Sequence, residues 1–157
     1  MRSSAMRFLC DEMLARLARL LRAAGYDTDL ASGGEPDTAL LARARAENRV
    51  LLTRDRKLAE RAHPRGLLVK GRTLDDEAQS VTRALPVDWS LAPFTRCVVD
   101  NASLVDATPD QVAAMPPEVR GGEGPFRTCP GCGRLYWPGS HVTRMKARLA
   151  GLSARQA

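Results

Sequence analysis

The segment Val50-Leu51-Leu52-Thr53-Arg54-Asp55 indicates how the rest of the chain folds. Its first four residues form a continuous apolar run, which favours a parallel strand covered on both faces. A second apolar run, residues 6–10, ends in the same way at Asp11. Segments with helical spacing separate the runs, and alternating strands and helices predict a parallel sheet with right-handed crossovers. Carboxylates that follow such strands meet at one edge of the sheet, where ligand sites open.

The predicted elements alternate along the first part of the chain. We expect strands at 6–10, 26–30, 50–53 and 66–69, and helices at 14–25, 37–48, 56–62 and 75–85, with Gly25 as a C-cap. The pattern breaks at 86–93, and beyond it come short runs rich in Cys, Gly and Pro, with a helix-like stretch at 109–115. The sequence therefore predicts an α/β core at 6–93 and a small module at 94–150 that ends in a basic helix.

Composition limits the classes of protein to consider. The chain of 157 residues is 44% hydrophobic, which supports one packed domain with a small appendage. Its net charge of +6 and pI of about 9.7 favour a polyanionic partner such as nucleic acid. No apolar run approaches the roughly 18 residues of a membrane span, and the first residues lack the order of a signal peptide. We expect a cytoplasmic protein that makes no membrane contact.

Acidic residues stand at four points where predicted strands end or helices begin. Asp11 and Asp55 follow strands, Asp37 opens a helix, and the cluster 75–77 opens another. Clustered carboxylates in a basic chain need a cation to coexist, and oxygen ligands suit Mg²⁺ or Mn²⁺. Each acid taken alone is also explained as a helix cap or a turn residue. Their shared placement favours metal-dependent phosphodiester chemistry.

Two separated motifs resemble one known family. The first comprises residues 8–22 (FLCDEMLARLARLLR), 25–28 (GYDT) and 51–56 (LLTRDR), and the second is residues 129–141 (CPGCGRLYWPGSH). They closely resemble the Mut-seven C-terminal RNase domain family. The resemblance implies a PIN-like nuclease core followed by a zinc ribbon, and a Mg²⁺- or Mn²⁺-dependent ribonuclease that hydrolyses mostly single-stranded RNA without a covalent enzyme intermediate.

The resemblance also implies roles for individual residues. Asp11 and Asp55 match the central metal ligands. Asp37 and one acid of the 75–77 cluster, for which we prefer Asp76, match the outer positions. Thr53 is expected to hold a carboxylate from behind. Apart from the resemblance, nearness in sequence to the acids makes Arg16, Arg19, Arg54 and Arg56 candidates for contact with phosphate, with Arg54 preferred, and a solvated helix face explains Arg16 and Arg19 equally well.

The cysteines predict a zinc site that departs from the family pattern. Cys129 and Cys132 form an intact Cys-x-x-Cys knuckle, but the first pair reads Cys97 and Asp100, where a second cysteine is expected. Three thiolates and one carboxylate remain feasible as zinc ligands, and His141 is an alternative fourth ligand. A third reading is that zinc is lost and the cysteines are reduced thiols.

Two alternatives to an independent ribonuclease stay open on sequence alone. One is a non-catalytic RNA-binding ribbon protein, in which the acids act as caps. The other is a toxin-type nuclease that a protein partner holds silent. PIN-like domains also often form homodimers, although no residue here identifies an interface. Tyr136 and Trp137 either stack on a base or pack across the ribbon.

Overall fold

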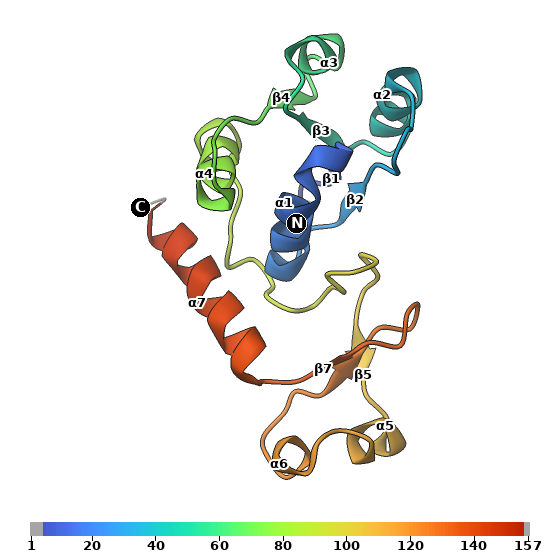
Figure 1. Ribbon diagram of the computed structural model, residues 1–157, viewed down its shortest axis with the longest axis vertical. Helices are drawn as coiled ribbons and strands as arrows, with labels where there is room; N and C mark the ends of the chain where they lie inside the picture. The colour runs from blue at the N-terminus through green and yellow to red at the C-terminus, as the bar shows by residue number, and fades with distance from the viewer. Residues whose placement is uncertain (1–4, 156–157) are drawn as a thin grey trace, which may run out of the picture.

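The computed structural model describes residues 5–155 and shows an α/β protein (Figure 1). The first part of the chain contains β1 (Phe8–Cys10), the 3₁₀ helix η1 (Glu12–Leu14), α1 (Ala15–Ala24), β2 (Thr28–Leu30), α2 (Asp37–Ala46), β3 (Val50–Thr53), α3 (Arg56–Arg61), β4 (Gly66–Leu68) and α4 (Leu74–Ala84). The second part contains β5 (Val105–Asp106), α5 (Pro109–Ala113), α6 (Pro117–Arg120), β6 (Arg127–Thr128), β7 (Leu135–Tyr136) and α7 (Ser140–Ala154).

A parallel sheet forms the centre of the first part, in the order β2-β1-β3-β4. The predicted α/β fold class is thereby confirmed, and each predicted strand and helix of this part is present with small shifts at its ends. One detail differs, because Pro36 precedes α2 as its N-cap and Asp37 is the first residue of the helix itself.

Helices cover both faces of this sheet, as the apolar character of its strands requires. Phe8 and Cys10 of β1 lie in one core cluster with residues of α1 and α4. Leu9, between them, lies in a second cluster with residues of α2 and α3. This split follows from the pleat of a strand, in which successive side chains point to opposite faces.

Gly25 ends α1 at a position that only glycine fits. Its φ is +106°, and a Cβ there would lie 2.6 Å from the carbonyl oxygen of Ala92. The amide of Ala92 in turn donates to the carbonyl of Ala24 at 2.9 Å. The end of α1 is therefore packed directly against the segment that leads into the second part of the chain.

The second part holds a small antiparallel sheet in the order β5-β6-β7, and α7 leads back to the first part (Figure 1). Leu149 and Leu152 of α7 are buried in the same core cluster as α1 and α4, and Arg148 pairs with Asp75 at 2.8 Å. The predicted basic helix is thus present, and its apolar face packs on the core. None of the helices within residues 5–155 has the length and apolar character that crossing a membrane requires.

Candidate functional site

Thr53 joins two of the predicted metal-binding acids at the carboxyl edge of the parallel sheet. Its hydroxyl donates to a carboxylate oxygen of Asp11 at 2.9 Å and accepts from the amide of Asp55 at 3.0 Å. Thr53 is fully buried at the end of β3, and Asp11 follows the neighbouring strand β1. The structure therefore brings Asp11, Thr53 and Asp55 together, in the arrangement that the positions of the two strands predict.

Both acids also cap helices, which the alternative interpretation of their positions predicts. Asp11 accepts from the amide of Glu12 at 2.8 Å and starts η1. Asp55 accepts from the amides of Lys57 and Leu58 at 2.9 and 3.3 Å and starts α3. Capping uses one oxygen of Asp55, Oδ1, and leaves its other oxygen available at the sheet edge.

The three acids of the 75–77 cluster have three different environments. Asp75 pairs with Arg148 of α7, and Asp76 accepts from the amides of residues 72 and 73 in a capping box at the start of α4. Glu77 pairs with Arg54 at 3.0 Å, and its side chain is only 15% exposed. Of the three, Glu77 is tied through Arg54 to the segment that carries Thr53 and Asp55. The carboxylate of Asp76, the acid preferred from the sequence, accepts hydrogen bonds from backbone amides just before its own helix.

Asp37 lies apart from this edge group in its contacts. Its carboxylate is half exposed at the start of α2 and lies 3.9 Å from the guanidinium of Arg61. Within residues 5–155, no three carboxylates bring oxygens within 4.8 Å of one another. The acids thus share an edge without forming a closed cluster.

The arginines predicted to bind phosphate fall into two groups. Arg54 forms an ion pair with Glu77, so its guanidinium already contacts an acid of the candidate site. Arg16 and Arg56 are exposed and have no carboxylate partner among residues 5–155. These two remain free to meet an anionic ligand.

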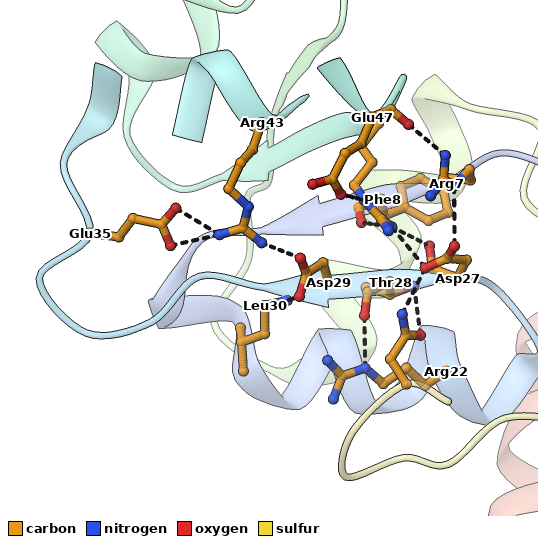
Figure 2. Close-up of polar contacts among 12 residues, drawn as sticks. Arg7, Phe8, Arg22, Asp27, Thr28, Asp29, Leu30, Glu35, Arg43 and Glu47 are labelled. Atoms are coloured by element: carbon orange, nitrogen blue, oxygen red, sulfur yellow. Dashed lines mark hydrogen bonds and ion pairs between the residues drawn. The ribbon is translucent and has the colours of Figure 1, made fainter. Parts of the chain in front are cut away.

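Sequence reasoning missed a second acidic group, Asp29 on β2 and Glu35 in the loop before α2, that is neutralised by an arginine (Figure 2). Arg43 of α2 donates to both oxygens of Glu35 at 2.7 Å and also pairs with Asp29. The hydrogen bond from Arg43 lowers the pKa of Glu35. These acids have their counter-charge within the chain, whereas among the residues that the structure describes Asp11 and Asp55 contact only neutral donors.

The four residues of the predicted zinc site do come together. The sulfur atoms of Cys97, Cys129 and Cys132 and a carboxylate oxygen of Asp100 all lie within 4.8 Å of one another. Asp100 Oδ1 lies 3.1 Å from the sulfur of Cys129. Gly131 makes this approach possible, because a Cβ there would stand 2.7 Å from the Asp100 carboxylate. The alternative ligand His141 is not in this group.

The cysteines of the cluster differ in the direction of their pKa shifts. Burial, together with the hydrogen bond to the adjacent Asp100 carboxylate, raises the pKa of Cys129 to about 11. Burial also acts on Cys97, but hydrogen bonds from the Tyr136 hydroxyl at 3.2 Å and from backbone amides outweigh it and lower the pKa of Cys97. Three sulfur donors and one carboxylate suit Zn²⁺, which displaces thiol protons when it binds. The Cys₃Asp set is compatible with zinc.

Hydrogen bonds fasten the first knuckle to the α/β core. The buried guanidinium of Arg22 on α1 donates to the carbonyl of Thr28 at 2.8 Å (Figure 2). It also donates to the carbonyls of residues 98 and 99 at 3.1 Å each. Asn101 accepts from the amide of Thr28 and donates to Asp27. The position of Cys97 and Asp100 is therefore coupled to β2, and no local sequence pattern predicts this connection.

Tyr136 and Trp137 differ in environment although they are neighbours. Tyr136 is 7% exposed, and its hydroxyl accepts from the amide of Val98 at 3.0 Å and donates to Cys97. Tyr136 therefore packs across the ribbon, which is the second of the two roles considered from the sequence. Trp137 is only partly buried.

Comparison with known proteins identifies a family that matches most of the chain. The Mut7-C RNAse domain matches residues 6–149, which confirms the resemblance of the two motifs. No curated protein and no solved structure matches the chain. Because the match spans almost all of the 157 residues, the chain belongs to the Mut7-C RNAse domain family, whose name suggests a nuclease-type function.

Proposed function

We propose that this protein is a Mg²⁺- or Mn²⁺-dependent ribonuclease that hydrolyses phosphodiester bonds of single-stranded RNA. The observation that carries the proposal is the Asp11–Thr53–Asp55 hydrogen-bonded group at the carboxyl edge of the sheet. Ligand sites of parallel α/β sheets open at this edge. Membership of an RNase domain family and a net charge of +6 support RNA as the substrate.

The donor set at this edge fits a hard divalent cation. Asp11 and Asp55 supply carboxylate oxygens that have no cationic partner within residues 5–155, and oxygen ligands are those that Mg²⁺ and Mn²⁺ prefer. We assign Glu77 as the fourth acid in place of Asp76, because Glu77 is tied to this edge through Arg54. We assign Asp37 the outermost position, at the start of α2. A bound divalent cation would supply charge stabilisation for the phosphate oxygens and lower the pKa of water.

The chain's own residues would then position the reactants. Thr53 holds Asp11 in one orientation by donating its hydroxyl proton from the buried side. Arg16 and Arg56, which lack acidic partners, would contact the flanking phosphates. In the reaction, a water oxygen bonds to phosphorus as the bond to the 3′ oxygen breaks, and that oxygen leaves with a proton.

The second part of the chain, residues 94–150, would bind substrate on a zinc-stabilised scaffold. Cys97, Asp100, Cys129 and Cys132 are the residues that would hold zinc. The ion would close the small three-stranded sheet, whose strands are two residues long and bury little apolar surface of their own.

Cleavage of a labelled single-stranded RNA tests the proposal directly. We expect wild-type protein to cut with Mn²⁺ or Mg²⁺ and to stop when the ion is chelated, and we expect Asp11→Asn and Asp55→Asn to be inactive yet folded. Asp76→Asn is the matched control, because its carboxylate only caps α4, whereas Glu77→Gln should lower the rate. Cutting that survives in both the Asp11 and Asp55 variants would refute the proposed site. RNA binding without any cutting would instead favour the non-catalytic RNA-binding alternative.

A further inference from the structure

A pocket of about 390 Å³ lies between α1, β7 and the start of α7. This volume is within the range of about 300–1,000 Å³ that is usual for small-molecule sites. Its lining is mostly apolar, with basic side chains among the residues that form it. The lining includes Arg19, Val98, Arg134, Trp137 and Met145.

Two of the lining residues carry uncompensated positive charge. Arg19 and Arg134 have no carboxylate partner among residues 5–155, and Arg134 lies over the ring of Tyr136 at 5.9 Å. Some arginines elsewhere in the chain, such as Arg43, Arg49 and Arg148, each contact an acid. Two unpaired guanidinium groups beside an apolar pocket favour a ligand that is planar or apolar in one part and anionic in another.

Trp137 supplies a stacking surface in this pocket. Its indole lies close to Gly139, where a Cβ would come within 2.8 Å of the indole nitrogen. The other tryptophan, Trp89, is fully buried and donates its indole N–H to Thr82 at 2.8 Å. The indole N–H of Trp137 makes no such bond within residues 5–155. It therefore retains both a ring face and a donor for a ligand.

We propose that this pocket binds a base of single-stranded RNA, stacked on Trp137, while Arg134 and Arg19 contact the adjoining phosphates. The inference rests on the proposed function for its choice of RNA, and charge complementarity supports it. A base offers an aromatic face to an indole, and its backbone offers anions to guanidinium groups.

A basic face of α1 connects this pocket with the acidic edge. Arg16 and Arg19 are three residues apart, so they lie on the same side of the helix, and both are exposed. Arg16 lies in the first turn of α1, which follows η1 and Asp11, and Arg19 lies in the next turn and lines the pocket. An RNA strand bound at Trp137 would therefore follow these arginines along α1 to the candidate catalytic residues.

The test uses the Asp55→Asn chain without Mg²⁺ or Mn²⁺, so that binding is measured in the absence of cutting. The probes are a labelled RNA octanucleotide and the same ribose-phosphate strand without bases. We expect Trp137→Ala to weaken binding of the normal strand by about 5- to 150-fold, because stacking on an aromatic side chain is worth about 1–3 kcal/mol per base. Trp137→Phe should restore most of that loss.

The strand without bases separates stacking from phosphate contact. The parent chain should prefer the normal strand, and Trp137→Ala should bind both strands alike. Arg134→Ala should weaken both and reduce the salt dependence of binding, whereas Arg45→Ala, an exposed arginine on α2, should change neither. RNA should also quench the emission of Trp137 and leave that of the buried Trp89 unchanged. Circular dichroism and zinc content check that each variant is folded.

Equal affinity of the parent and Trp137→Ala for the normal strand would overturn the inference, as would an unchanged tryptophan emission. Cleavage by the wild-type chain is measured separately with Mn²⁺. Cutting that proceeds normally in Trp137→Ala would remove the pocket from the mechanism and leave the ribonuclease intact. Base-dependent binding at Trp137 in a chain that never cuts would keep the pocket and refute the ribonuclease.

Discussion

Replacing Thr53 with valine removes one hydroxyl from the candidate active site and little else. Thr53 is 0% exposed, and valine matches its shape, so the change is confined to two hydrogen bonds. The bond donated to the Asp11 carboxylate is charge-assisted and worth about 1.5–3 kcal/mol. The amide of Asp55 also loses its acceptor, at a cost of about 1–3 kcal/mol. Asp11 is only partly buried and recovers part of its loss from water, so we expect the free energy of unfolding to fall by roughly 2–3 kcal/mol.

The effect on activity follows from the position of Thr53 behind a proposed metal ligand. Removing a group that orients a ligand typically costs about 10- to 100-fold in metal affinity or activity. Initial rates of RNA cleavage, measured across a range of Mn²⁺ concentrations, should show that loss in Thr53→Val. Urea unfolding of the same samples gives the change in stability.

Thr28→Val is the matched control. Thr28 is also fully buried in the same sheet, but its hydroxyl donates to the carbonyl of Tyr26 at 3.1 Å and contacts no acid. It should lose about 1 kcal/mol of stability and keep its Mn²⁺ dependence. A Thr53→Val chain that is destabilised but cleaves with an unchanged Mn²⁺ response would show that the Asp11–Thr53–Asp55 link is structural only.

Three further predictions concern the rest of the fold. Protein prepared without chelators should contain about one zinc per chain by metal analysis. Asp100→Cys should hold zinc more tightly in a competition assay, because a thiolate replaces the carboxylate among the ligands. A folded, zinc-free sample would contradict this prediction. Arg22→Met should weaken zinc binding and lower the free energy of unfolding by roughly 3 kcal/mol, since the guanidinium holds the knuckle carbonyls, whereas Arg45→Met should change neither. Burial raises the pKa of Asp27, but hydrogen bonds led by that of Arg49 lower it to about 2. The carboxylate therefore contributes about 2 kcal/mol above pH 4 that is lost as the pH falls through 2, and Asp27→Asn should flatten stability over that interval in acid titrations.

The parallel sheet could be predicted because its signals are local. Each strand is a short apolar run, and Gly25 marks the end of α1 at the one place where a left-handed residue is needed. The meeting of Asp11 and Asp55 follows from strand direction alone, since the carboxyl ends of adjacent parallel strands share an edge. The predicted division of the chain near residue 93 stays a prediction, and Trp89 and Phe94 on either side of it lie in one core cluster.

What escaped prediction depends on contacts between distant residues. Nothing near Arg22 signals that its side chain is buried against carbonyls 76 and 77 residues away. The strands of the small sheet are two residues long, too short for any periodicity to appear. The choice between Asp76 and Glu77 depends on the rotation of α4, which places one acid on its own N-terminus and the other against Arg54.

The return of α7 onto α4 holds the second part of the chain against the first, and this would determine how far apart the two ends of an RNA bound as proposed are held. Leu149 and Leu152 are buried against the core, and the hydroxyl oxygens of Ser153 and Ser90 lie 2.7 Å apart. The end of α7 is therefore fixed to the first part of the chain. A base in the Trp137 pocket would then stand at a constant distance from Asp11. If RNA binds and is cut as proposed, the number of nucleotides between the anchored base and the cut would be determined by the protein and not by the RNA sequence.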